Sequence, residues 1–92
     1  MSNLLTGIAW YRREQYPLLL SVSTDSDNLA KTYDEWRRNV IETMEKLKAH
    51  GIPTQKVDVE VKELVEWCQR HHKELDGGAR AQFVTTKLGN SN

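Results

Sequence analysis

The clearest periodicity of apolar and polar positions lies in the middle of the chain. Apolar side chains recur there every three or four residues, the spacing of one helix face: Trp36, Val40, Met44 and Leu47. Thr32 precedes this stretch and Glu35 follows it by three residues, a capping box in which the hydroxyl accepts from the Glu35 N–H and the carboxylate reaches back. Gly51 predicts a left-handed C-terminal cap, and Pro53 prevents continuation. The sequence therefore predicts a long helix between Thr32 and Gly51.

Two short segments have the pattern of β-strands. Thr6–Tyr11 is short and rich in β-branched and aromatic residues. The polarity of the residues alternates from Thr54 to Val61, which places three valines on one face: Val57, Val59 and Val61. The strand is expected to end near Glu60. Because helical sequence separates the two strands, they are most simply parallel and joined by a crossover.

A further helix is expected between the first strand and the central helix. It runs from Arg12 to about Thr24, and Pro17 is tolerated near its first turn because the missing N–H has no helical partner there. The apolar run Leu18–Val22 is also compatible with a strand, since short apolar runs carry no decisive periodicity. Residues 25–28 have the composition of a loop.

Two more helices follow the second strand. The first has an apolar face at helical spacing: Val61, Leu64, Val65 and Cys68. It ends at His71–Lys73, where cations suit the negative end of the helix dipole. Asp76 is the expected cap of the last helix, Gly77–Lys87.

The predicted fold is a small α/β domain of order β-α-α-β-α-α, with two short parallel strands and four helices. We expect residues 1–92 to form one domain, ordered over about residues 5–88, with a frayed tail at 89–92. A sheet of two parallel strands leaves both edges open. Either the helices or a second copy of the chain must cover these edges, so a homodimer is one of the two expected arrangements.

Composition narrows the class of protein further. The chain has 92 residues, 38% hydrophobic and 28% charged, which is typical of a globular domain. Thirteen basic and thirteen acidic side chains cancel, which argues against a nucleic-acid partner. The single cysteine, the lack of a signal-peptide pattern at the start and the lack of a long apolar run predict a cytoplasmic protein with no membrane association.

Three segments resemble a small family of bacterial proteins in the same order along residues 7–84. They are Ile8–Tyr16 (IAWYRREQY), Thr32–Trp36 (TYDEW) and Glu66–Cys68 (EWC). In that family the third helix often opens with Asp-Pro, whereas this chain has Glu60-Val61. The resemblance implies a bacterial or phage origin, and it implies no function.

One candidate site combines Cys68 with the histidines that follow it. Cys68 lies three and four residues before His71 and His72, so it shares a helix side with either imidazole. A structural zinc site needs four ligands, and this cluster supplies too few unless His50 or Asp76 adds to it. The alternative is a buried cysteine and two histidines at a helix end. We therefore expect no metal and no cofactor, with Cys68 and His72 as the alternative ligands.

A second candidate site lies at the carboxyl ends of the parallel strands, where open α/β sheets bind ligands. It consists of Tyr11, Arg12, Arg13 and Glu60. Helix N-termini and an arginine clamp would favour a small anion there. The alternative is that the arginines are solvated and pair with Glu14 or Asp58, and no glycine-rich phosphate loop is present.

The tryptophans give the third candidate. Trp10 and Trp36 are expected to fill the core. Trp67 lies off the apolar face of its helix, so it is expected either to be exposed as the anchor of a protein interface or to pack under the last helix. Because no reactive constellation is present, the sequence favours a non-enzymatic protein-interaction or assembly module that self-associates. A ligand-binding domain is the second hypothesis, and a metal or thiol enzyme is the third.

Overall fold

The computed structural model describes residues 5–89. Within this range the elements are β1 (Thr6–Trp10), α1 (Tyr16–Val22), α2 (Tyr33–Ala49), β2 (Thr54–Asp58), α3 (Val61–Arg70) and α4 (Gly77–Gly89). The predicted α/β class and the β-α-α-β-α-α order are confirmed. Of the tail expected to fray, Gly89 closes α4, and residues 90–92 lie outside the described residues.

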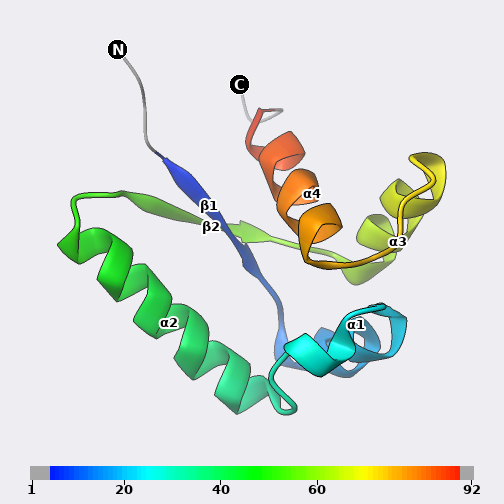
Figure 1. The fold of residues 1–92 in the computed structure, drawn as a ribbon, viewed down its shortest axis with the longest axis horizontal. Coiled ribbons are helices and arrows are strands. Elements are labelled where there is room, and N and C mark those ends of the chain that lie inside the picture. Colours follow the sequence, from blue (N-terminus) through cyan, green and yellow to red (C-terminus); the bar gives the residue numbers. More distant parts are fainter. Residues whose placement is uncertain (1–4, 90–92) are drawn as a thin grey trace.

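The two strands form a parallel sheet at the centre of the molecule, as predicted (Figure 1). Ile8 lies opposite Lys56, and Ala9 lies opposite Val57. The Thr6 N–H donates to the carbonyl of Pro53 at 3.0 Å, at the start of the ladder. Figure 1 shows α2 on one side of the strands and α3 and α4 on the other.

The core lies where β2, α3, α4 and α1 meet. Its fully buried side chains are Tyr16, Leu19, Val61 and Leu64. Val57 and Val59 are also buried, so the valine face of the second strand points inward as its alternation predicts. Ala79, Phe83 and Val84 complete the core from α4.

The segment between β1 and α2 is less regular than predicted. The expected single helix from Arg12 to about Thr24 is a 3₁₀ turn over Arg13–Gln15 followed by α1, which starts at Tyr16. Pro17 lies in the first turn of α1, where its missing N–H leaves no helical bond unmade. The alternative that Leu18–Val22 is a strand is wrong.

Helix α2 has the ends that the sequence predicts. The Thr32 hydroxyl oxygen accepts from the Glu35 N–H at 3.1 Å. The Glu35 carboxylate lies 3.3 Å from that hydroxyl and not on the Thr32 amide, so half of the predicted capping box forms. At the other end Gly51 adopts a φ of 75°, and the Ile52 N–H donates to the Leu47 carbonyl, which together form a Schellman motif.

The apolar stripe of α2 is in the predicted place, yet none of its side chains is buried. Trp36, Val40, Met44 and Leu47 are all half-buried. The expectation that Trp10 and Trp36 fill the core holds only in part: both are half-buried, Trp36 packs against the buried core, and the centroids of the two indole rings lie 5.2 Å apart. Periodicity identifies the inward face of a helix but not the depth to which that face is covered.

Candidate functional site

The predicted anion site brings Arg12 and Glu60 together as an ion pair. Arg12 Nη2 lies 3.1 Å from Glu60 Oε2, and Arg12 Nε lies 3.1 Å from Glu14 Oε2. The hydrogen bonds that Arg12 donates to Glu60 and Glu14 raise the pKa of its guanidinium. Two carboxylates thus accept from two of the guanidinium nitrogens and offset its charge, which disfavours an added anion. The predicted pairing with Glu14 is confirmed, and Glu60 takes the place that was expected for Asp58.

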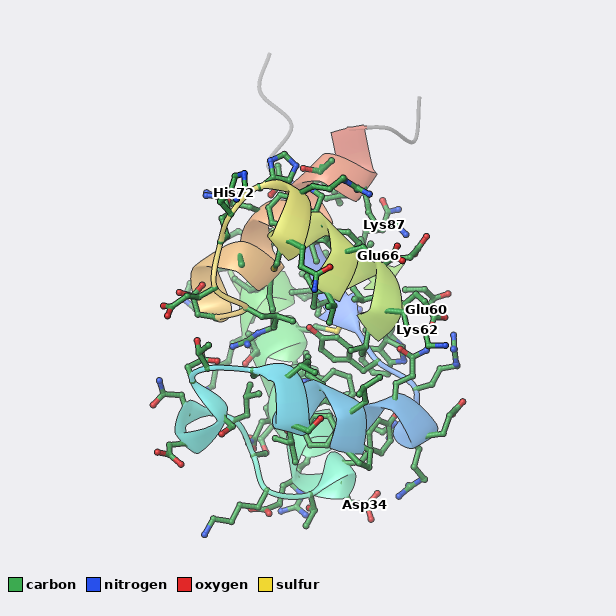
Figure 2. All side chains as sticks on the ribbon, turned by 90° about the vertical axis from the view of Figure 1, so that its right-hand side faces the viewer. Asp34, Glu60, Lys62, Glu66, His72 and Lys87 are labelled. Atoms are coloured by element: carbon green, nitrogen blue, oxygen red, sulfur yellow. The ribbon has the colours of Figure 1, made fainter. Side chains whose placement is uncertain are left out.

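Arg13 points to a different part of the molecule. Its Nη2 lies 2.7 Å from Asp34 Oδ1, and its guanidinium lies over the Tyr33 ring at 4.7 Å. The hydrogen bond from Arg13 lowers the pKa of Asp34. Figure 2 shows Asp34 far from Glu60, so Arg12 and Arg13 reach toward separate partners and do not form one clamp.

Tyr11 lies inside the protein and not at an exposed strand end. Its side chain is buried, and this burial raises the pKa of the Tyr11 phenol to about 12. Its carbonyl accepts a hydrogen bond from the Tyr33 hydroxyl at 3.0 Å. Tyr11 therefore supports the junction between β1 and α2.

The N-terminus of α3 is capped by a residue that sequence reasoning missed. The Val61 N–H donates to Gln15 Oε1 at 2.7 Å, and Gln15 is buried. The two residues are 46 positions apart in the sequence, so no local sequence pattern predicts this hydrogen bond. Gln15 uses the amide that a small anion would otherwise bind at this helix end.

Cys68 and His72 differ sharply in their surroundings. Cys68 is buried, and this burial raises the pKa of its thiol, which lowers its reactivity. His72 is exposed at the end of α3, as Figure 2 shows, and has a φ of 55°. Across residues 5–89, no group of three or more His, Cys, Asp or Glu side chains is arranged to hold a metal ion.

Trp67 is buried, so it offers no exposed anchor to a partner. Its side chain is 8% exposed, and its ring lies 5.8 Å from that of Phe83 on α4. Of the two expectations for Trp67, packing under the last helix is confirmed and exposure at an interface is wrong. The apolar face of α3 is wider than its stripe suggests because α4 covers its flank.

A hollow with an apolar lining lies beside β1 and has a volume of about 620 Å³. We call it the β1 groove. It is lined by residues of β1, α2, α4 and the adjoining segments: Leu5, Thr6, Gly7, Ile8, Ala9, Tyr11, Leu29, Trp36, Val40, Arg80, Ala81, Val84, Thr85 and Leu88. Figure 1 shows β1 running between α2 and α4. Residues of both helices line the groove, one helix on each side of the strand.

The lining of the β1 groove is almost free of charge. Its charged residue is Arg80, whose guanidinium holds Asp25 through Nη1 at 2.9 Å and Nη2 at 2.8 Å. Arg80 also donates to Ser23 Oγ at 3.2 Å. The hydrogen bonds from Arg80 lower the pKa of Asp25. Because this cation is already paired, the β1 groove suits an uncharged occupant.

A second hollow, of about 600 Å³, lies on the other flank of α2 and reaches the start of β2. Ile41 and Met44 of α2 line it together with Ile52. Charged side chains also line it: Glu45, Lys48 and Lys56. Both flanks of α2 are therefore incompletely covered, and the less charged one is the β1 groove.

The sequence gives one signal for the β1 groove, namely a first strand without charged residues, whereas the position of that strand between α2 and α4 follows only from the fold. No helix within the described range is long and apolar enough to cross a membrane. Comparison with family models, with curated proteins and with solved structures found no match to this chain. The predicted bacterial origin therefore stays a prediction.

Proposed function

We propose that this protein is a non-enzymatic assembly module that acts through self-association. The observation that carries this proposal is the incomplete burial of α2. It is the longest helix of residues 5–89 and has an apolar stripe, yet none of its side chains is buried within the chain. A half-buried apolar stripe on a small domain is typical of a surface that another molecule covers.

The strand next to α2 supports the same proposal. All five residues of β1, Thr6–Trp10, are half-buried, and Leu5 beside them is 44% exposed. A sheet of two strands has little independent stability unless helices or further strands cover it. A second copy of the chain would supply that cover.

The polar groups that the sequence suggested for chemistry are used within the chain. Arg12 and Arg13 pair with carboxylates, and Cys68 is buried. For this reason we favour assembly over ligand binding or catalysis. We place the protein in the cytoplasm, because a chain with one buried cysteine gains no internal disulfide in an oxidising compartment.

Light scattering after size-exclusion chromatography, from micromolar to millimolar concentrations, tests this proposal. We expect the mass to approach twice the 10.7 kDa of one chain as the concentration rises. A mass that stays at one chain over the whole range would contradict self-association.

A further inference from the structure

We propose that two copies of this chain pair their β1 strands antiparallel, each β1 lying in the β1 groove of the other, so that two two-stranded sheets join into one sheet of four strands. This inference rests on the proposed self-association and specifies its interface. The strand order of the joined sheet is β2-β1-β1-β2, with a two-fold axis between the β1 strands.

The backbone of β1 has one edge available for pairing. The Thr6 N–H and the Trp10 carbonyl both bond toward β2, at 3.0 Å each. Since backbone groups of successive residues in a strand point to opposite sides, those of Gly7 and Ala9 point away from β2. Gly7 and Ala9 both line the β1 groove. Their amides and carbonyls form a template for an added strand.

The surroundings of this edge select an uncharged, extended occupant. On one wall, Val84 and Leu88 of α4 lie against Gly7 so closely that an added Cβ there would approach them to 2.7 and 2.5 Å. On the other wall, Trp36 and Val40 of α2 are half-buried. A strand added between these walls would cover apolar side chains on both faces of the sheet.

The two strands differ in charge in a way that favours β1 as the pairing edge. β1 has the sequence Thr-Gly-Ile-Ala-Trp and carries no charged residue. β2 carries Lys56 and Asp58, whose backbone groups face its outer edge by the same alternation. Charged residues on an edge strand discourage pairing with other chains. The outer edge of β2 is thus protected, and the edge of β1 is not.

A second copy fits this edge because β1 is complementary to itself. In a register centred on Ile8, Gly7 lies opposite the partner's Ala9, and Ala9 lies opposite the partner's Gly7. Each of these pairs exchanges both of its backbone hydrogen bonds. The chain has a net charge of zero, so no net repulsion opposes the approach of a like molecule.

The two-fold axis also brings the groove walls together. An axis perpendicular to the sheet keeps each helix on its own face, so α2 meets the partner's α2 and α4 meets the partner's α4. Trp36 and Val40 then pack between the α2 helices. Ala81 and Thr85, which are exposed on the groove side of α4, then face the partner's α4. The surfaces left open in one chain become the interior of the dimer.

Disulfide cross-linking tests the pairing of the strands directly. Ile8 and the partner's Ile8 would form a non-hydrogen-bonded pair with Cα atoms about 4.5 Å apart, which lies within the range of a disulfide. We expect Ile8→Cys to form a covalent dimer under mild oxidation. Lys56→Cys, at the same register position on β2, is the matched control and is expected to stay uncross-linked. The wild-type chain controls for Cys68. Equal cross-linking of both variants, or none in Ile8→Cys, would contradict the proposed pairing.

Association measurements on neighbouring threonines of α4 test the groove wall. Thr85 and Thr86 are both exposed, and each hydroxyl bonds the carbonyl four residues earlier, but Thr85 alone of the two lines the β1 groove. We expect Thr85→Glu to weaken dimerisation by about tenfold or more and Thr86→Glu to leave it unchanged. Circular dichroism of both variants verifies that each is folded.

The results of these experiments distinguish the proposed β1 interface from the more general proposal of self-association. If the wild type dimerises but both glutamate variants dimerise equally well, the β1 pairing is wrong and self-association stands. If the wild type is monomeric at every concentration and Ile8→Cys forms no covalent dimer, the proposed function fails as well.

Discussion

Helices α2 and α3, which lie on opposite sides of the sheet, are packed to very different depths (Figure 1). Helix α3 has ten residues and buries Val61, Leu64, Trp67 and Cys68. Helix α2 has seventeen residues and buries none. Both have an amphipathic pattern, and the pattern of α3 is the stronger of the two. The helices also differ in their neighbours: α4 and α1 pack against α3, whereas α2 has the sheet on one side and open flanks.

Helix α2 is nevertheless attached at its N-terminal end by aromatic rings. The Trp36 ring lies between 5.2 and 5.9 Å from four other rings, those of Trp10, Tyr11, Tyr16 and Tyr33. Pairs of this kind contribute beyond the area they bury. Aromatic contacts at one end therefore hold this helix in place although its flanks stay uncovered. A monomer built in this way retains an apolar surface for a partner.

Truncation of one leucine on each helix tests the difference in packing between α3 and α2. Leu64 of α3 is fully buried, and Leu47 of α2 is half-buried. We expect Leu64→Ala to lower the free energy of unfolding by about 2–5 kcal/mol, since truncation leaves a cavity. Leu47→Ala should cost about 1 kcal/mol, because less apolar area is lost. Chemical denaturation of both variants measures the two values. Equal costs would mean that α2 is packed as tightly as α3.

A second substitution probes the contact between α4 and β1. An added Cβ at Gly7 would lie 2.5 Å from Leu88 Cδ1 and 2.7 Å from Val84 Cγ1. We expect Gly7→Ala to destabilise the protein by about 1–3 kcal/mol through overpacking. Gly78→Ala is the control, since its Cβ would meet Asp76 at 3.5 Å, an ordinary contact. A thermal melt in which Gly7→Ala is as stable as wild type would show that α4 lies loosely on β1.

A third prediction concerns the ion pair that ties α4 to the loop after α1. The side chains of Arg80 and Asp25 are 12% and 20% exposed, and Asp25 also accepts from the Gly77 N–H at 3.1 Å. We expect Asp25→Ala to cost about 1–2 kcal/mol, between an exposed and a buried pair. Asp27→Ala, in the same loop and exposed, should cost much less. Urea titrations at neutral pH compare the two variants.

The same carboxylate predicts a dependence on pH. The pKa of Asp25 is lower in the folded protein than its ordinary value of 3.8. Its contribution to stability is therefore fully present above that value and is lost as the pH falls through the lower, folded pKa. Urea titrations between neutral pH and pH values below 3.8 should show a smaller loss of stability in Asp25→Ala than in the wild type. Parallel pH profiles would contradict this role.

The weakest changes in stability are expected at the C-terminal caps of α2 and α3. Gly51 occupies the left-handed position after α2, with a φ of 75°, and His72 occupies the equivalent position after α3, with a φ of 55°. The His72 and Lys73 amides donate to the Gln69 and Cys68 carbonyls, which is again a Schellman motif. We expect His72→Gly to stabilise the protein by about 0.5–1 kcal/mol, because glycine avoids the cost of a Cβ there. Gly51→Ala should destabilise it by about 1 kcal/mol. Differential scanning calorimetry resolves both, and a loss of stability in His72→Gly would give that imidazole a structural role.

Local patterns were sufficient to predict the elements and their order. Thr32 and Gly51 bound α2, and the alternation around Val57 identifies β2, because caps and side-chain periods act over a few residues. Parallel pairing followed from the helices between the strands. These predictions needed no knowledge of tertiary contacts.

The candidate sites were harder to predict because they depend on distant contacts. Gln15 caps α3 across 46 residues, and Arg80 holds Asp25 across 55 residues. The burial of the tryptophans depends on the same kind of contact: Trp67, for which exposure and packing under the last helix were both expected, is covered by α4, whereas Trp36 lies on a helix with open flanks. A helical pattern specifies which side of a helix is apolar, and only the assembled fold decides what covers it.

The charges on β2 also bear on how far assembly can proceed. Two molecules joined through β1 would present β2 at both outer ends of their common sheet, with Lys56 and Asp58 on each. A like strand cannot dock there without desolvating those charges. Growth by strand addition would therefore stop at a closed, symmetric pair, and the exposed backbone of this small domain would not template fibres.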